Sequence, residues 1–155
     1  MLQIFRISSF ITIGLLALRA WGAPGPARVF VEPFGEKPGA SGLRTELVRL
    51  LEKEPHITVA DDATKADFIV SGTGETYIKG YLGTNPRVRY LNSEAQPVYG
   101  GYLSVELKNP EHETVWSYLV TPRRFGPEDI NRNLAGQIVN RLAQEIAVER
   151  KAAKP

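Results

Sequence analysis

Very few side chains in this sequence have the type and spacing that catalysis or metal binding requires. The 155 residues include no cysteine and two histidines, His56 and His112, which fall in different predicted loops. They therefore form neither a recognisable zinc site nor a Ser-His-Asp site. Asp61, Asp62 and Asp67 lack the alternating ligands and closing glutamate of a calcium loop, and turn formation or capping explains them better. We expect no metal, no cofactor and no catalytic residues, and we predict that the protein is not an enzyme.

A glycine pair follows one of the predicted strands. Gly72-Thr73-Gly74 has part of the pattern of a phosphate-binding loop, but it lacks the third glycine and the Gly-Lys-Ser/Thr ending, and no helix follows. Glycine inside a strand more often marks a bend or a bulge. We therefore expect a bend or bulge here and no phosphate site.

Aromatic and basic residues gather in the second half of the chain. All six tyrosines lie between residues 77 and 118, together with Trp116. Tyrosine is a common strand residue, so the cluster has a purely structural explanation. Aromatic side chains interleaved with arginine can also bind glycans or peptides. Glutamates in the same stretch argue against a cationic patch, and we expect no nucleic-acid partner. The candidate binding residues are Arg87, Arg89, Tyr90, Tyr99, Arg123 and Arg124.

The first 22 residues have the features of a secretory signal peptide. Arg6 precedes an apolar run over residues 7–18, which would be about 18 Å long as a helix, against about 30 Å for a hydrocarbon core. Small residues at Ala20 and Gly22 predict cleavage after Gly22. An uncleaved anchor, favoured by Arg19, and a buried helix are the alternatives. Without a cysteine to acylate, we expect a periplasmic or extracellular protein that has no transmembrane span and no lipid anchor.

Removal of residues 1–22 changes the charge of the protein. The full chain has 19 basic and 17 acidic residues, a formal net charge of +2. Two of the basic residues, Arg6 and Arg19, lie in the predicted signal peptide, which contains no acidic residue. The mature chain is then formally neutral, so bulk charge does not select its partner.

The remaining residues predict one α+β domain. After a linker over 23–27, the domain covers 28–150 and a frayed tail covers 151–155. Apolar runs predict strands at 29–31, 57–59 and from 68 toward 78, and a weaker alternation suggests a strand at 87–90. Leucines at helical spacing predict a helix over about 42–54, stopped by Pro55. An apolar stripe predicts a second helix over about 127–150, with Pro127 at its first position.

A hairpin is predicted between residues 102–108 and 113–120, with its turn at 109–112. A loop centred on Pro110-Glu111 gives one aromatic and aliphatic face and one mostly polar face, as in a sheet covered on one side. The predicted chain order is β-α-β-β-(β)-β-β-α. It corresponds to a two-layer sandwich with a mainly antiparallel sheet of about four to six strands and both helices on one face. The predicted pairs on the apolar face are Leu103 with Tyr118, Val105 with Trp116, and Leu107 with Thr114.

Short motifs along the domain resemble a group of bacterial envelope proteins. The motifs are Val29-Phe30-Val31-Glu32-Pro33-Phe34, Ala66-Asp67-Phe68-Ile69-Val70-Ser71-Gly72, a Leu-x-Val-x-Leu…Val-Trp hairpin and a closing Ile-Val-x-Arg-Leu-Ala-x-Glu-Ile helix. This layout, over about residues 28–149, is similar to the TolB amino-terminal domain, to the curli-secretion protein CsgG and to related small lipoproteins. The resemblance implies a sheet with helices on one side and a role in envelope assembly or protein interaction. The chain departs from the lipoproteins because it has no cysteine to carry a lipid.

The sequence thus favours an exported, non-enzymatic envelope protein that binds another protein or a glycan. Two alternatives stay open. One is a small secreted hydrolase or glycan-processing enzyme, which would need paired buried carboxylates or a serine beside His56 or His112. The other is a subunit of an oligomeric secretion assembly, since the sequence also allows a homo-oligomer.

Overall fold

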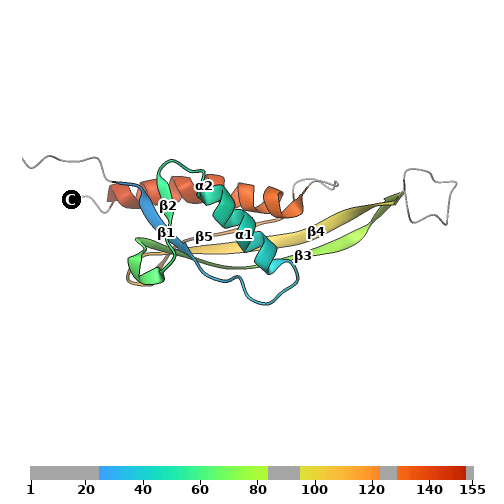
Figure 1. Ribbon diagram of the computed structural model, residues 1–155, viewed down its shortest axis with the longest axis horizontal. Coiled ribbons are helices and arrows are strands. Elements are labelled where there is room, and N and C mark those ends of the chain that lie inside the picture. The colour runs from blue at the N-terminus through green and yellow to red at the C-terminus, as the bar shows by residue number, and fades with distance from the viewer. Residues whose placement is uncertain (1–24, 84–94, 123–128, 153–155) are drawn as a thin grey trace, which may run out of the picture.

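The computed structural model describes residues 25–83, 95–122 and 129–152 (Figure 1). The predicted signal peptide over 1–22 and the predicted strand at 87–90 lie outside these residues. No helix within the described ranges is long and apolar enough to cross a membrane. The elements are β1 (Ala27–Val31), α1 (Ala40–Leu51), β2 (Ile57–Val59), the short 3-10 helix η1 (Ala63–Lys65), β3 (Phe68–Gly83), β4 (Ala95–Lys108), β5 (Thr114–Val120) and α2 (Ile130–Ala152).

The five described strands form one mixed sheet in the order β2-β1-β3-β4-β5. The strand β1 pairs in parallel with β2 and β3, because α1 carries the chain back between β1 and β2. Longer antiparallel pairings join β3 to β4 and β4 to β5. Both helices lie on one face of this sheet (Figure 1), which confirms the predicted α+β sandwich.

The core fills the space between the sheet and the two helices. Alternate residues of the inner strands point into it, as expected for a sheet covered on one side. Each helix contributes a stripe of fully buried aliphatic residues at helical spacing. Fully buried aliphatic residues include Val29, Val31, Val70, Leu103, Val105 and Leu107 from the sheet and Leu43, Leu47, Leu51, Leu134, Ile138 and Leu142 from the helices.

The glycine pair lets the helical layer approach the sheet, and the predicted bend or bulge is not found at this position. Gly72 and Gly74 pair regularly with β4 and face the core. A Cβ atom built on Gly72 would lie 3.2 Å from the ring of Phe34, and one built on Gly74 would lie 2.6 Å from Leu43 Cδ1. Both positions therefore leave room for side chains of the covering layer.

Helix α2 begins later than the sequence predicts. Its first residue is Ile130, and Asp129 is its N-cap, because Asp129 Oδ1 accepts hydrogen bonds from the backbone N–H groups of Asn131 (3.1 Å) and Arg132 (3.3 Å). Pro127, predicted as the first helical residue, lies outside the described residues. Helix α1 starts at Ala40 and stops at Leu51, ahead of Pro55.

From Trp116 to Val120 the residues of β5 lie on their predicted faces, with Trp116, Tyr118 and Val120 toward the helices, but the predicted register is wrong by two residues. Thr114 was predicted on the apolar face and lies on the other face, opposite Lys108, whereas Val115 packs against the core. From Leu103 to Leu107, each residue of β4 meets a residue of β5 two positions beyond its predicted partner. The observed pairs are Leu103 with Val120, Val105 with Tyr118, and Leu107 with Trp116.

Two separate one-residue shifts produce this register. The first arises in the turn, where the His112 N–H bonds to Asn109 O (3.0 Å) and His112 has a φ of 63°. The Asn109 N–H also bonds to Glu113 O (3.0 Å), so the strands are joined by a three-residue loop that ends in a left-handed residue. The second shift is a bulge that leaves Val115 without a partner on β4. Two odd shifts add up to an even one, so the residues of β5 beyond the bulge keep their predicted faces although their partners differ.

Strands β3 and β4 continue well beyond the helices. Figure 1 shows them as a long two-stranded ribbon that leaves the body of the molecule on one side. Pairing of β4 with β5 ends at Leu103, and pairing of β1 with β3 ends at Val70. We call the part of this ribbon formed by residues 76–83 and 95–101 the β-arm. Its two strands pair with each other along its length.

Candidate functional site

Of the six candidate binding residues from the sequence, the structure describes Tyr99. It lies on β4 in the β-arm, opposite Ile78, and is partly buried. The other five, Arg87, Arg89, Tyr90, Arg123 and Arg124, lie outside the described residues. The proposed arginine surface therefore stays a prediction, and the site is built from the aromatic and aliphatic residues of the arm.

The apolar face of the sheet continues onto the β-arm after the helices end. Ile78 and Tyr99 lie on the side that faces the helices, each four residues beyond Gly74 and its partner Leu103. A bulge at Lys79 shifts the register, so that Tyr81 pairs with Pro97 and returns to the same side as Tyr99. Ile78 is 49% exposed and Tyr81 is 65% exposed. We call Ile78, Tyr81, Pro97 and Tyr99 the arm patch.

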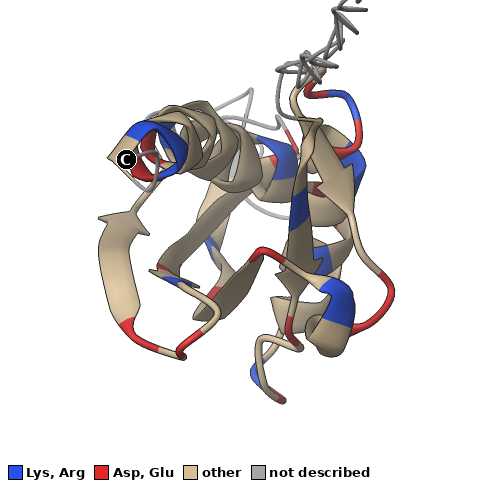
Figure 2. Cartoon of the chain, turned by 90° about the vertical axis from the view of Figure 1, so that its left-hand side faces the viewer, with Lys and Arg blue, Asp and Glu red and all other residues tan. Residues whose placement is uncertain are grey.

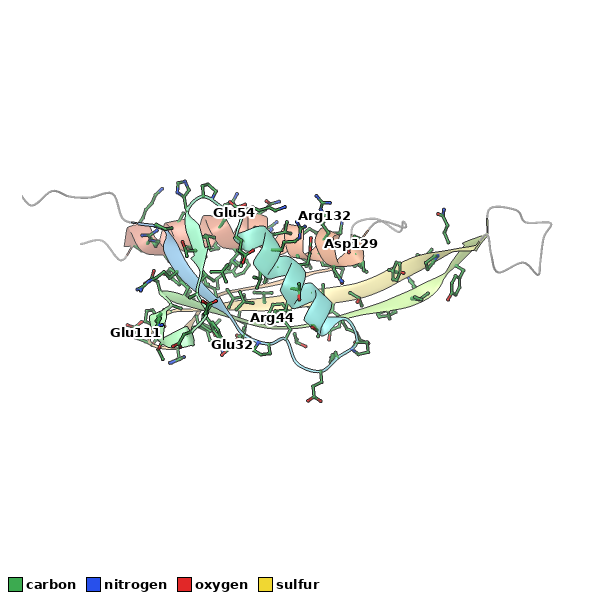
Figure 3. The ribbon with its side chains drawn as sticks, viewed as in Figure 1. Glu32, Arg44, Glu54, Glu111, Asp129 and Arg132 are labelled. Carbon is green, nitrogen blue, oxygen red and sulfur yellow. The ribbon has the colours of Figure 1, made fainter. Side chains whose placement is uncertain are left out.

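A cavity lies where the arm patch meets the start of α2. Its volume is about 440 Å³. Figure 3 labels Asp129 at the end of α2 that lies toward the arm. Beside it, the Oδ1 atom of Asn131 is buried and has no hydrogen-bond partner among the described residues. The cavity therefore combines an apolar wall with hydrogen-bonding groups. It is lined by Thr76, Tyr77, Ile78, Tyr99, Asp129, Ile130 and Asn131.

The described tyrosines divide into two groups. Tyr102 accepts a hydrogen bond from Lys37 Nζ (2.6 Å), and this bond raises the pKa of Lys37. Tyr118 stacks on Trp116 with ring centroids 5.8 Å apart, and the guanidinium of Arg141 lies 4.3 Å from the Tyr118 ring centroid. These aromatic residues have partners within the fold, which supports the structural explanation for them.

The second group is exposed on the β-arm. Tyr81 belongs to the arm patch, and Tyr77 is 50% exposed on the opposite side, where it packs over Gly100. The sequence analysis selected aromatic residues near arginine and so missed Tyr77, Ile78 and Tyr81. The available signal was the run of strand-forming residues from Thr76 to Leu82, which continues past the glycine pair without a proline to end it.

Two ion pairs among the described residues lie on β1 and α1, outside the arm. Arg28 Nη2 donates to Asp67 Oδ1 (2.8 Å), and this hydrogen bond is the main cause that lowers the Asp67 pKa. On α1, Arg49 Nε donates to Glu46 Oε2 (2.7 Å) and lowers the Glu46 pKa. The first pair joins β1 to the residue just before β3, and the second joins adjacent turns of α1. Both pairs therefore act as structural contacts at the surface.

The described part of the chain holds no arrangement that suggests catalysis. It contains no cluster of three His, Asp or Glu side chains that could bind a metal, and none of its buried residues is charged. His56 and His112 are exposed, and neither side chain hydrogen-bonds to a described residue. The paired buried carboxylates or histidine-linked serine that a hydrolase would need are not seen in these ranges.

Comparison with known proteins gives a fold but no family. No family model matches the chain, and no curated protein matches it. Among solved structures, it is similar to XCC0632 from Xanthomonas campestris, described as DUF330, with a TM-score of 0.52 and 9% identity over 88% of this chain and 93% of that one. Two others are a PelC dodecamer from Paraburkholderia phytofirmans (TM-score 0.46, 16% identity, 74% and 86% covered) and a minor lipoprotein from Acinetobacter baumannii (0.40, 9%, 80% and 94%). At this identity, the XCC0632 likeness establishes the shared fold.

Proposed function

We propose that the protein is exported to the cell envelope and acts there as a non-catalytic binding protein, with the arm patch as its contact surface. The partner is another envelope protein or an envelope glycan. The export signal predicted over residues 1–22 supports the location. The resemblance to the TolB amino-terminal domain and to CsgG supports an envelope role.

The observation that carries this proposal is the exposure of the arm patch. Ile78 and Tyr81 are on the apolar side of the sheet, yet about half or more of each side chain contacts solvent. A two-stranded ribbon is only marginally stable by itself, so leaving its apolar side uncovered has a cost. Clustered apolar and tyrosine side chains next to a cavity are typical of contact surfaces.

The arm patch suits both partner classes for the same chemical reason. Tyr99 and Tyr81 combine a flat apolar ring with a hydroxyl group, which contacts either a protein side chain or the face of a sugar. Asp129 and Asn131 add hydrogen-bonding groups at the cavity wall. The partner is therefore expected to bring both apolar area and polar groups to the base of the arm.

Site-specific photo-crosslinking in intact envelopes tests the proposal. A photo-crosslinking amino acid replaces Tyr81 in one version of the full chain and the exposed Gln144 of α2 in another. We expect discrete adducts at position 81 that are weakened by Ile78→Ser and unchanged by Val148→Ser. Val148 is 56% exposed on α2 and serves as the matched apolar control.

The outcomes separate the partner classes. If a glycosidase removes the mass that the partner adds to the adduct, the partner is a glycan. If the added mass resists glycosidase and yields peptides of a second protein after digestion, the partner is a protein. If positions 81 and 144 give the same adducts, or position 81 gives none, the arm patch is not the contact surface.

A further inference from the structure

The β-arm and the cavity at its base carry little charge. Figure 2 faces the end of the molecule opposite the arm, where basic and acidic residues gather on the loops and at the end of α2. Among residues 76–83 and 95–101, which form the arm, Lys79 is the only charged residue. Among the described residues that line the cavity, Asp129 alone is charged. A ligand held there is therefore selected mainly by ring contacts and hydrogen bonds.

The charge of Asp129 is already balanced within the fold. Its Oδ1 atom accepts the two backbone N–H bonds that cap α2, at the end of the helix that favours a negative charge. Arg49 lies nearby, since its pKa is raised mainly by the hydrogen bond with Glu46 and also by the charge of Asp129. The carboxylate therefore does not need a cation from a ligand. Its Oδ2 atom has no hydrogen-bond partner among the described residues and can accept a hydrogen bond.

A second acceptor belongs to the cavity wall. Asn131 lines the cavity, and its Oδ1 atom is buried without a hydrogen-bond partner among the described residues. A buried acceptor that lacks a donor costs about 1–3 kcal/mol. The amide lies against α1, because its Nδ2 atom is 2.9 Å from the position of a Cβ atom built on Gly42. The polar end of the cavity thus suits a ligand that brings hydroxyl donors.

The apolar wall of the cavity continues along the arm. Ile78 and Tyr99 line the cavity, and Tyr81 and Pro97 follow them on the same side of the ribbon. Tyr99 and Pro97 are two residues apart, which is about 7 Å along a strand. Tyr99 is partly buried, so its ring forms a supported flat surface. A chain of linked sugar rings can place one ring in the cavity and lay the next ones along these side chains.

We propose that the cavity and the arm patch bind a neutral glycan chain. Hydroxyl groups of one sugar donate to Asp129 and Asn131, and the following sugars lie against Tyr99 and Tyr81. This inference rests on the proposed function of the arm patch and selects one of its two partner classes. A stable protein interface uses about 20–30 residues a side, far more than the arm patch and the cavity wall provide. A cavity of about 440 Å³ has the size of a site for a small ligand.

Binding of short oligosaccharides to the purified full chain tests this proposal. Cellotetraose and N-acetylated chitotetraose are the neutral probes, a chitosan tetramer is the cationic comparison, and a galacturonate tetramer is the anionic one. Nuclear magnetic resonance titration measures each dissociation constant from the backbone amide signals. We expect at least one neutral tetramer to bind more tightly than both charged ones, with signal changes concentrated at Ile78, Tyr99 and Asn131.

Variants separate binding from stability. Because Asn131 Oδ1 has no partner in the described fold, Asn131→Ala should leave the urea unfolding midpoint unchanged or higher, while it weakens binding about tenfold. Tyr99→Ser should weaken binding by a similar factor, whereas Tyr99→Phe keeps the ring and should retain most of it. Asn140→Ala is the matched control, since Asn140 is an exposed asparagine of α2, and it should not change binding.

Three results would overturn the proposal. These are no binding of either neutral tetramer at millimolar concentration, tighter binding of a charged tetramer, and wild-type affinity in both Asn131→Ala and Tyr99→Ser. The crosslinking experiment distinguishes this failure from failure of the proposed function. Peptides of a second protein crosslinked at position 81, without oligosaccharide binding, would keep the arm patch as a contact surface and reject the glycan. Absence of both would reject both proposals.

Discussion

Adding one methyl group at Gly74 should destabilise the fold, because this glycine makes room for α1. The Cβ of Gly74→Ala would lie 2.6 Å from Leu43 Cδ1 and 3.1 Å from Leu103 Cδ1. Both leucines are fully buried, so neither side chain has free space to move into. Overpacking of this kind costs about 1–3 kcal/mol. The entropy that alanine removes from the unfolded chain offsets about 0.4–1 kcal/mol of this cost.

Gly80 provides the matched control in the same strand. A Cβ atom added at Gly80 would meet no other atom within 4 Å, and the residue has no left-handed φ, so Gly80→Ala should be neutral or slightly stabilising. Urea unfolding followed by circular dichroism measures both variants. With slopes of about 1–3 kcal/mol/M, Gly74→Ala should lower the midpoint by roughly 0.5–1 M.

A double-mutant cycle identifies the contact responsible. Leu43→Val removes the δ-carbons that the new methyl group would meet. Gly74→Ala should therefore cost less in the Leu43→Val background, with a coupling of about 1 kcal/mol. Equal midpoints for Gly74→Ala and Gly80→Ala, or an unchanged cost in the Leu43→Val background, would refute the explanation that Gly74 is required for helix approach.

Two further predictions concern polar contacts. Asp129→Ala should lower the free energy of unfolding by about 1 kcal/mol through loss of the α2 N-cap, whereas Asp129→Asn, which can still cap, should retain most of it in the same assay. The Arg28 guanidinium lowers the folded-state pKa of Asp67, so its stabilisation is present above the unfolded pKa of about 3.9 and is lost as pH falls through the lower folded value. Unfolding midpoints measured from pH 5 to 2 should fall less steeply in Asp67→Asn, and an unchanged slope would mean that the pair contributes nothing.

The sequence predicts the elements and faces of this fold better than the pairings between strands. Apolar periodicity is local, so it identified both helices and the strand cores. The register of the β4–β5 hairpin depends on the left-handed backbone of His112 and on the bulge at Val115. A left-handed backbone is uncommon for any residue other than glycine, so the sequence did not mark His112, and nothing in the side-chain pattern marks Val115 as unpaired. Such shifts are invisible to a pattern with a period of two.

The same limit explains why the arm patch was missed. Ile78 and Tyr81 are three residues apart, a spacing that places residues on opposite faces of a regular strand. They share a face because the bulge at Lys79 adds one residue between them. Tyr99, on the unbulged partner strand, was selected from composition and does lie in the patch. Sequence reasoning thus found a patch residue on β4, the strand of the arm that has no bulge.

The lengths of the elements decide which apolar residues remain uncovered. Strand β3 has 16 residues and extends about 53 Å, whereas α2 has 23 residues and extends about 35 Å. The cover therefore ends near Thr76, where the Thr76 N–H bonds to Pro38 O just ahead of α1. Across the sheet, α2 covers β5 on one side only, and no described strand follows β5. The described sheet is thus longer than two helices can cover, which is why the arm patch lies beyond the helical layer.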